Sequence, residues 1–483
     1  MNRSLSPDRL ATLLAKFPRT PAHRGLRQGL QELIGDGRIA DGTRLPSERA
    51  VSQALGVSRN TVTRAYADLA IAGFATARQG AGTFATVPQS RWRAHDHSLR
   101  SLDRVHPHEG SIDLVCAATS AIPGLVAASE RALHKLPAYL GNDGYLPTGL
   151  PVLQALIAES YVRRGLPTTP DQIMVTSGAL AAVAIVARAL SQPGDRVMIE
   201  SPVYPNAMGA LRLGGGRLVA APIGNALGEE GWDLDGNEIT LRQALPRLTY
   251  LIPDFQNPTG FLMRDAERAR YAHALRAART IPVVDEAQQA MGLTDEAMPL
   301  PFAVHAPEAV TIGSASKLLW GGLRVGWIRA PCDMIDRLFK ARVQFDLGTP
   351  VLDQLIAVEL LNEDGVIATR REQLRQRRDA LAQAIKQRLP DWRFRLPEGG
   401  LTLWLRLPHG SATQLAANLQ AAGVHVAPGP MFSVDGGADN WLRIAYVRPE
   451  EELIEAVERI ARVWSTMPAE SSSRQDARWA LIT

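Results

Sequence analysis

The residue best suited to covalent chemistry is a lysine in a chain that contains few lysines. Only five of the 483 residues are lysine, and one of them, Lys317, lies in SASKLLWGGLRVGWI, residues 314–328. The pattern puts Lys317 at the end of an expected strand and before a glycine-rich turn. A buried ammonium group is unfavourable unless it is neutralised, and formation of a Schiff base with an aldehyde neutralises it. Lys317 is therefore a candidate for attachment of an aldehyde cofactor.

A second candidate chemistry is contact with nucleic acid, and it comes from arginines near the N-terminus. Residues 1–110 carry a net charge of +7, whereas the rest of the chain carries −3. Fifteen of the sixteen cations in this segment are arginines, whose forked guanidinium groups suit phosphates and guanine edges. A solvated basic surface would give the same excess, so the charge alone leaves both interpretations open.

The elements expected to position these arginines form a helix-turn-helix with a wing. Apolar residues recur at helical spacing over 22–36 and in two shorter segments that Ser47 and Ser58 can cap. Two short strands, at 76–77 and 82–85, flank the turn QGAG. The pattern predicts a three-helix domain followed by a two-stranded hairpin.

Residues 42–85 resemble the winged helix-turn-helix of GntR-family transcription regulators over their whole length. LPSER, LGVSRNTV and a G-x-GTF wing occur in the order of that family. The resemblance implies double-stranded DNA as a partner, with base reading by the first turn of the third helix, where side chains meet base edges. Thr63 stands where several relatives carry a second arginine, which leaves open whether it or Arg64 faces DNA. The implied DNA contacts are Arg44, Arg49, Ser58, Arg59, Asn60, Thr61, Arg64, Gly80 and Gly82.

The rest of the chain divides into a linker, a large domain and a tail. We predict the DNA-binding domain over 10–86, a linker over 87–111, an effector and dimerisation domain over 112–465, and a tail over 466–483. The linker carries four histidines, but no cysteine or HExxH spacing accompanies them, so solvated histidines are the simpler interpretation and no metal site is predicted.

In the large domain, β-rich apolar runs alternate with helical stretches. The expected strands are 173–175, 196–199, 248–252, 282–284, 309–312 and 326–329, and the expected helices include 179–191, 265–279 and 367–388. This alternation predicts an α/β domain with a mostly parallel sheet, covered by helices on both faces. A smaller α+β lobe follows toward the C-terminus.

Residues 114–463 resemble fold-type I aminotransferases, which implies the cofactor pyridoxal 5′-phosphate. Lys317 matches the lysine that binds this cofactor covalently, and Asp285 matches the carboxylate that keeps the ring nitrogen protonated. Arg443, in NWLRIAYV, matches the arginine that binds the α-carboxylate of an amino acid. The other implied cofactor contacts are Ser177, Gly178, Ala179, Ser314 and Arg324 for the phosphate, Tyr204 for stacking, Asn257 for the phenolic oxygen, and Tyr145 from the neighbouring subunit.

The sequence departs from that family just after Asp285. The family usually places a tyrosine two or three residues later, whereas Ala287 and Gln288 stand there in this chain. Gln288 remains able to donate a hydrogen bond to the cofactor, so cofactor binding is expected. Loss of the phenol predicts a site tuned less toward catalysis.

The two resemblances together identify the chain as similar to MocR-type regulators, a branch of the GntR family. They imply a homodimer whose cofactor domain senses an amino acid, an amine or the vitamin itself. Two alternatives stay open: a working aminotransferase that carries a DNA-binding module, and a repressor whose second domain only dimerises.

The chain lacks the signals of other compartments. It holds no run of about 18 apolar residues, and its first twenty residues have no apolar core, which predicts neither a membrane segment nor a secretory signal. Two cysteines cannot form a disulfide framework in a chain of this length. We expect a cytoplasmic protein.

Overall fold

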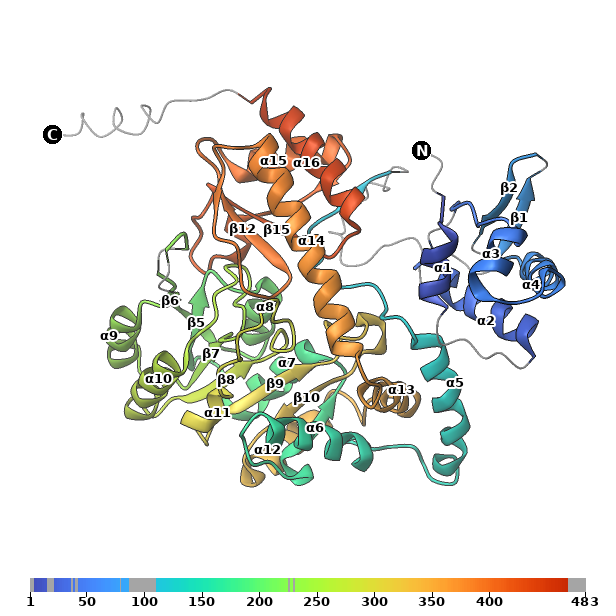
Figure 1. The fold of residues 1–483 in the computed structure, drawn as a ribbon. Helices are drawn as coiled ribbons and strands as arrows, with labels where there is room; N and C mark the ends of the chain where they lie inside the picture. Colours follow the sequence, from blue (N-terminus) through green and yellow to red (C-terminus); the bar gives the residue numbers. More distant parts are fainter. Residues whose placement is uncertain are drawn as a thin grey trace. The chain divides into compact units, whose positions relative to one another are not determined.

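The computed structural model describes residues 4–14, 21–35, 38–39, 42–78, 80–86, 110–224, 226–228 and 231–467. They form two compact units (Figure 1). The first contains the described residues up to 86 and also 121–130, and the second contains 110–120 and 131–467. Most of the expected linker, including its four histidines, and most of the expected tail lie outside the described residues.

The first unit consists of helices around a small apolar core, followed by a hairpin. Its elements before the linker are α1 (Pro7–Leu13), α2 (Ala22–Gly35), α3 (Glu48–Leu55), α4 (Arg59–Ile71), β1 (Ala75–Arg78) and β2 (Gly82–Ala85). The α1 helix was not predicted, because seven residues are too few to show a clear helical period. The core side chains are at the expected apolar positions, including Leu26, Leu30, Leu33, Val51, Val62 and Leu69.

The turn between α3 and α4 forms as the sequence predicts. Gly56 ends α3 in the left-handed conformation, with φ of +65°, which glycine adopts without strain. Two residues later Ser58 caps α4, and its Oγ accepts from the Thr61 amide at 3.1 Å. The wing strands pair antiparallel with Thr76 opposite Phe84, which confirms the predicted hairpin.

The second unit is built on a seven-stranded sheet that confirms the predicted α/β class. Its strand order is β4-β10-β9-β8-β7-β5-β6, and β10 alone runs antiparallel to its neighbours. The strands are β4 (Ile173–Thr176), β5 (Arg196–Ser201), β6 (Arg217–Pro222), β7 (Leu248–Leu251), β8 (Ile281–Asp285), β9 (Val310–Ser314) and β10 (Gly326–Arg329). Six of them were predicted within a few residues; β6 was missed because this edge strand is only half-buried and lacks a clear apolar run.

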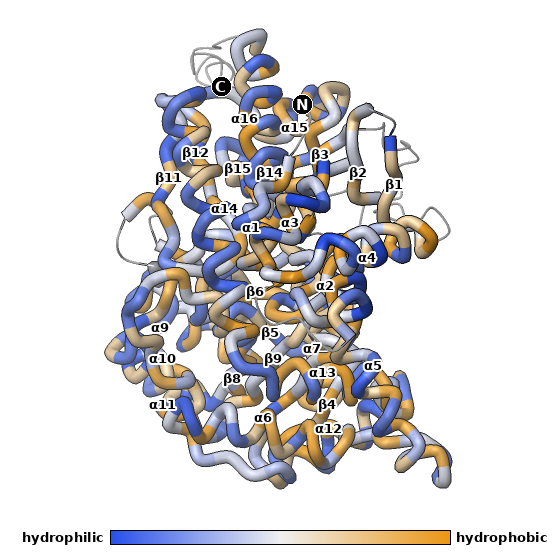
Figure 2. Tube along the Cα trace, turned by 45° about the vertical axis from the view of Figure 1, so that its right-hand side comes forward, coloured by the Kyte–Doolittle hydropathy of each residue, from blue (hydrophilic) through white to orange (hydrophobic). Residues whose placement is uncertain are grey.

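Helices cover this sheet. They are α6 (Pro151–Arg163), α7 (Ala179–Leu190), α8 (Pro205–Leu213), α9 (Leu234–Ala244), α10 (Asp265–Ala277), α11 (Phe302–His305), α12 (Cys332–Arg342) and α13 (Val351–Leu361). The helix α5 (Leu125–Lys135) begins in the first unit and ends in the second. Figure 2 shows hydrophobic residues along α7 and α13. The α7 side chains Val183, Ile185, Val186 and Leu190 belong to the main core. Among the described helices, none combines the length and apolarity needed to cross a bilayer.

A smaller α+β lobe completes the second unit, as predicted. Its antiparallel sheet has the order β11-β12-β15-β14, and a short parallel pair joins β13 to β3. The elements are β3 (Ile112–Asp113), β11 (Arg393–Phe394), β12 (Thr402–Arg406), α15 (Ala412–Ala421), β13 (Val424–His425), β14 (Ala427–Pro428), β15 (Trp441–Ala445) and α16 (Glu450–Trp464). The long helix α14 (Val366–Arg388) runs from α13 to this lobe (Figure 1).

Candidate functional site

Lys317 lies three residues after the end of β9, on the turn that the sequence predicts. Its Nζ donates to the carbonyl of Ala117 at 2.8 Å. Burial lowers the pKa of the Lys317 amine, and the neighbouring cations Arg443 and Arg324 lower it further, whereas Cys116 and Asp285 raise it. A lowered pKa increases the neutral, nucleophilic fraction of an amine at neutral pH. Lys317 thus has the environment that attachment of an aldehyde needs.

Asp285 ends β8 with its carboxylate held between two donors. The hydroxyl of Tyr250 donates to Oδ2 at 2.6 Å, and the amide of Ala287 donates to Oδ1 at 2.9 Å. Burial raises the pKa of Asp285, and both hydrogen bonds lower it. A buried carboxylate fixed in this way favours a cationic partner, such as a protonated ring nitrogen.

Arg443 and Asn257 meet near Lys317. Arg443 lies on β15 and is 5% exposed. Its Nη1 donates to Asn257 Oδ1 at 3.1 Å, and its Nη2 donates to the carbonyl of Val115. Burial lowers the pKa of Arg443 to about 10. Among the described residues no carboxylate forms an ion pair with Arg443, and its Nε is buried without a partner, so the guanidinium can accept an anionic ligand.

The predicted phosphate site is assembled at the N-terminus of α7. Gly178 precedes the helix with φ of +93°, and Arg324 donates from Nη2 to the Ser177 carbonyl at 3.0 Å. A Cβ at position 178 would lie 2.5 Å from Arg324 Nη2, so glycine is required for this approach. The free amides at the helix start and the guanidinium form a cationic recess suited to phosphate. Ser314, at the end of β9, accepts from the Ser316 amide at 3.1 Å.

Tyr204 lies near Asp285 and Arg443, Gln288 is buried three residues after Asp285, and Tyr145 lies on an exposed turn. Burial raises the pKa of Tyr204, and the charges of Asp285 and Arg443 act on its hydroxyl. Gln288 is buried, and its Oε1 has no hydrogen-bond partner among the described residues. Tyr145 is 61% exposed on a turn. Its predicted role, a contact with a neighbouring subunit, stays a prediction.

Sequence reasoning missed several groups that hold this site together. Tyr250 reads as an ordinary core residue of a strand, and backbone carbonyls such as that of Ala117 have no sequence signature. Arg370 is hidden among the many arginines of α14. It is 1% exposed and donates to the carbonyls of Leu318 and Leu319, which follow Lys317, and to that of Ser120. Arg370 therefore fixes the turn that carries Lys317.

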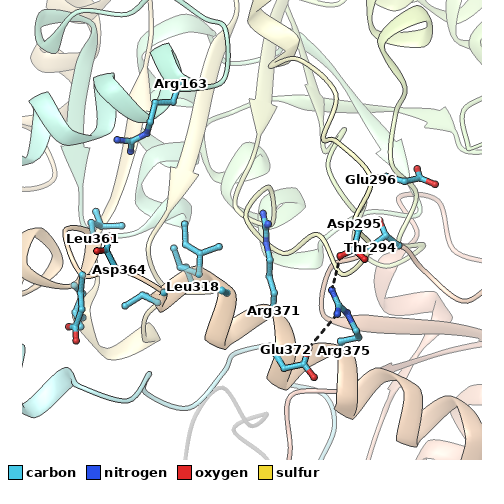
Figure 3. A pocket seen from close by; sticks show the side chains of 16 residues that line it. Arg163, Thr294, Asp295, Glu296, Leu318, Leu361, Asp364, Arg371, Glu372 and Arg375 are labelled. Atoms are coloured by element: carbon cyan, nitrogen blue, oxygen red, sulfur yellow. Dashed lines mark hydrogen bonds and ion pairs between the residues drawn. The ribbon is translucent and has the colours of Figure 1, made fainter. Parts of the chain in front are cut away.

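A separate cavity of about 960 Å³ lies in the second unit (Figure 3). Leu318 lines it, but none of the predicted cofactor residues does. At its wall Arg375 pairs with Glu372 at 3.4 Å and with Asp295 at 3.5 Å, whereas Arg371 donates to the carbonyl of Ala290 at 2.8 Å. Because the residues suited to an aldehyde cofactor lie around Lys317 and not in this cavity, the Lys317 site is the candidate active site.

Most of the predicted DNA contacts on α3, α4 and the wing are exposed. Arg49, Ser58, Asn60, Arg64, Gly80 and Gly82 are exposed, and the Arg59 side chain is 74% exposed. Thr61 is half-buried because its amide and hydroxyl contact the capping Ser58. Val62 faces the core, as predicted.

Two details refine this surface. Thr63 Oγ1 donates to Glu48 Oε2 at 2.7 Å, and Arg59 lies 3.7 Å from the same oxygen. Thr63 is thus tied to α3, which favours Arg64 as the contact at this position. The side chain of Arg44 crosses the wing, where a Cβ at Gly82 would lie 3.1 Å from its Nε.

The fold and the two sites define a helix-turn-helix protein joined to an aminotransferase-like domain, and comparisons with known proteins agree. Residues 127–460 match the family of class I and II aminotransferases, and residues 23–85 match the gntR family of bacterial regulatory proteins. The chain therefore belongs to the family of class I and II aminotransferases. Because its N-terminal part matches the gntR family, it is a GntR-type regulator of the MocR type.

Individual relatives cover both parts of the chain. A 2-aminoadipate transaminase of Thermus thermophilus is 32% identical over 72% of this chain and 85% of its own length. The probable rhizopine catabolism regulatory protein MocR of Rhizobium meliloti is 30% identical over 77% of this chain and 78% of its own length. The crystal structure of LysN, an α-aminoadipate aminotransferase of Thermus thermophilus complexed with N-(5′-phosphopyridoxyl)-L-leucine, superimposes with a TM-score of 0.67 at 30% identity, over 74% and 92% of the two chains.

The family and the site agree on pyridoxal 5′-phosphate as the cofactor. The structure offers a lysine of lowered pKa, which fits the aldehyde, and an oriented buried carboxylate, which fits the ring nitrogen. At Gly178 a Cβ would collide with Arg324, so the glycine leaves room beside the helix start, which fits the phosphate. Membership of the gntR family likewise implies that the first unit binds DNA.

Proposed function

We propose that the chain is a homodimeric transcription regulator that senses an amino acid or amine through pyridoxal 5′-phosphate bound at Lys317. The observation that carries this proposal is a partly buried amine of lowered pKa in the same chain as a helix-turn-helix. DNA is the partner of the first unit, which also supports the expected cytoplasmic location.

In this proposal each residue of the pocket has a distinct task. Lys317 supplies the amine that attaches the cofactor, and Asp285 keeps a proton on the ring nitrogen. Ser177, Gly178, Ala179, Ser314 and Arg324 bind the phosphate, Tyr204 covers the ring, and Asn257 and Gln288 donate to its phenolic oxygen. When bound, the cofactor supplies a reactive carbonyl carbon and an electron-withdrawing ring.

Arg443 selects the effector. Its guanidinium is buried and without a carboxylate partner among the described residues, so an effector carboxylate, or the sulfonate of a sulfonated amine, would bind there. Arg443 alone does not select the distance between the amine and the acid of the effector, because α-, β- and γ-amino acids all present one amine and one anion. The vitamin itself remains a second kind of effector.

On the DNA side, Arg59, Asn60, Thr61 and Arg64 read bases, while Arg44, Arg49, Ser58 and the glycines of the wing position the phosphates. A helix-turn-helix dimer binds two half-sites about one helical turn or a multiple apart. The second unit would form the dimer, with Tyr145 reaching the phosphate of the neighbouring subunit. Effector binding changes DNA occupancy only if the effector prefers one state of the dimer.

The test is footprinting of the DNA upstream of the chain's own gene, with and without the cofactor and a panel of amino acids. We expect two protected half-sites whose protection changes with the effector. The Lys317→Ala variant should lose absorbance near 420 nm and the effector response, whereas Lys386→Ala, which removes an exposed lysine, should keep both. An unaltered effector response in Lys317→Ala would contradict the proposal.

A second candidate function is transamination by a chain that also binds DNA. The identity with the 2-aminoadipate transaminase and the presence of Lys317, Asp285 and Arg443 favour it, whereas Gln288 in place of the usual tyrosine disfavours it. An assay with keto-acid acceptors separates the two functions: turnover of about 1 s⁻¹ or more, the low end for enzymes, would support transamination.

A further inference from the structure

Arg443 lies in an apolar part of the small-lobe sheet. The strands β12 and β14 flank β15 and place Trp404 and Ala427 directly opposite Arg443. Trp441 lies two residues before Arg443 on β15, and residues i and i+2 of a strand face the same side of the sheet. The face of the sheet that carries the guanidinium therefore also carries two tryptophans.

The aromatic side chains on this face form one cluster with Phe432. The rings of Trp404 and Trp441 are stacked, with centroids 5.4 Å apart and an interplanar angle of 8°. Phe432 meets Trp404 edge to face at 5.5 Å, and its ring centroid lies 4.8 Å from Arg443 Cζ. A ring against one face of a guanidinium leaves the N–H groups in the guanidinium plane to bind a ligand.

The members of this cluster differ in exposure. Trp404 and Phe432 are buried. Val115 and Trp441 pack against them but stay half-buried. Val115 also lies beside the guanidinium, because its carbonyl accepts from Arg443 Nη2. The apolar surface next to Arg443 therefore includes the side chains of Val115 and Trp441, which together we call the apolar subsite.

The guanidinium keeps donors for a carboxylate next to this subsite. A guanidinium has five N–H groups, and in the described part of the chain two of those of Arg443 donate, to Asn257 and to Val115. Its Nε is buried without a partner among the same residues. A carboxylate can therefore bind the remaining N–H groups while both contacts persist. The rest of the bound effector then lies near the apolar subsite.

The subsite suits an apolar effector side chain better than a charged one. Two cations lower the pKa of Lys317: Arg443, which would bind the first carboxylate, and Arg324, which lies in the phosphate recess. A second effector carboxylate would lie against rings and methyl groups, where an unpaired charge is unfavourable. An apolar side chain instead removes its own surface and that of Trp441 from water.

We propose that the apolar subsite selects the effector, and that the effector is an α-amino acid with one carboxylate and an apolar side chain that covers Val115 and Trp441. This inference rests on the proposed function, since it takes Arg443 as the group that binds the effector carboxylate. It narrows the class of effector, because dicarboxylic amino acids place a charge on the subsite, and β-alanine or a sulfonated amine leaves it uncovered.

The first experiment compares amino acids as ligands of the full-length protein loaded with pyridoxal 5′-phosphate. Leucine, phenylalanine, alanine, 2-aminoadipate and taurine are titrated, and the change in absorbance near 420 nm gives each affinity. We expect leucine and phenylalanine to bind more tightly than the other three by about tenfold or more, since one methylene in an apolar pocket can already have such an effect. If alanine, 2-aminoadipate or taurine bound as tightly as leucine, the proposal would be overturned.

The second experiment reduces the subsite without touching a hydrogen bond. Val115→Ala removes the methyl groups and keeps the carbonyl that accepts from Arg443. We expect the affinity for leucine to fall by about fivefold, because less apolar surface is covered, and the affinity for alanine to stay the same. A merely structural role of Val115 predicts an equal loss for both amino acids, and that result would refute the subsite. The control is Ile454→Ala, which shortens an exposed aliphatic side chain of α16 and should change neither affinity.

The third experiment reverses the preference. Trp441→Arg places a cation in the subsite, so the ratio of the leucine affinity to the 2-aminoadipate affinity should fall by about tenfold or more, the factor that a hydrogen bond to a charged group is worth. An unchanged ratio would count against the subsite. Trp464→Arg is the matched control, because Trp464 is a half-buried tryptophan of the same lobe that packs on Trp392 instead, and this variant should keep the ratio of the wild type.

The two proposals fail separately. Absence of absorbance near 420 nm, or DNA occupancy that no amino acid changes, refutes the proposed function. A normal DNA response to amino acids, with 2-aminoadipate or taurine preferred over leucine, refutes only the apolar subsite.

Discussion

The hydroxyl of Tyr250 on β7 donates to Oδ2 of Asp285 on the neighbouring strand β8 at 2.6 Å, and both side chains are buried. Parallel pairing sets Leu251 opposite Val284, so the ends of the two strands bring the phenol to the carboxylate. This bond lowers the pKa of Asp285 and so opposes the effect of burial. The strand register thus helps to keep the carboxylate charged.

Removal of the Tyr250 hydroxyl should weaken the cofactor site. In Tyr250→Phe the pKa of Asp285 rises, because burial remains while one stabilising hydrogen bond is lost. We expect cofactor affinity to fall by about five- to tenfold, in line with roughly 1–1.5 kcal/mol for the bond. Titration of the 420 nm absorbance measures it. Tyr271→Phe is the matched control, since that buried hydroxyl has no partner among the described residues, and an equal loss there would argue against the assignment.

A second prediction concerns Glu200, a buried carboxyl at the end of β5. It accepts from Trp232 Nε1 at 2.8 Å, from Gln256 Nε2 at 3.1 Å and from the Ile252 amide at 3.2 Å. Burial outweighs these bonds and raises the pKa of Glu200 to about 7. A folded-state pKa above the unfolded one means that this group stabilises the protein most at low pH and that this stabilisation is lost as the pH rises from about 4.5 to about 7.

The Glu200→Gln variant should lack this part of the pH dependence. Because one pKa unit corresponds to about 1.4 kcal/mol, the difference in unfolding free energy between wild type and variant should change by up to roughly 3 kcal/mol between pH 4.5 and 8. Thermal unfolding of both proteins across this range measures it. A constant difference across the range would show that Glu200 does not titrate there.

A third prediction concerns the buried Arg370. Burial lowers its pKa to about 10, and it donates to the carbonyls of Leu318, Leu319 and Ser120 and to the side-chain oxygen of Gln373 at 3.3 Å rather than to a carboxylate. Arg370→Met leaves these acceptors without a donor, so we expect a loss of about 3 kcal/mol in unfolding free energy. Arg388→Ala, which removes an exposed ion pair to Glu458 at 2.7 Å, should cost less than about 1 kcal/mol. Denaturant unfolding measures both, and equal effects would contradict a clamping role for Arg370.

The sequence predicted those parts of the fold that depend on local pattern. Capping by Ser58, the left-handed turn at Gly56 and the apolar positions of α4 follow from short-range rules, and the structure confirms them. The α/β architecture followed from the alternation of apolar strands and helices. The short α1 and the edge strand β6 were missed, because neither has enough buried positions to show a period.

The candidate site could be predicted only where side chains carry the chemistry. The strand ends bring Lys317 and Asp285 together, and the motifs of a known family pointed to both. The carbonyl of Ala117 and the side chain of Arg370 act through hydrogen bonds between side chains and backbone carbonyls of distant segments, such as residues 117 and 317 or 120 and 370. No local pattern encodes those contacts, because they depend on how distant segments pack.

The final prediction separates base reading from phosphate contact in the first unit. Arg59 begins α4 with an exposed side chain, and we expect Arg59→Ala to weaken operator binding by about 1–3 kcal/mol while it relaxes the preference at one base position. Arg49, on α3, should act on phosphates, so Arg49→Ala should weaken binding equally for all sequences and reduce the slope of log K against log salt by about 1. Arg242→Ala, on α9 of the second unit, should change neither. Binding assays with operator and scrambled DNA at several salt concentrations measure these effects, and an Arg59→Ala loss that is the same for both DNAs would show that Arg59 contacts phosphate instead.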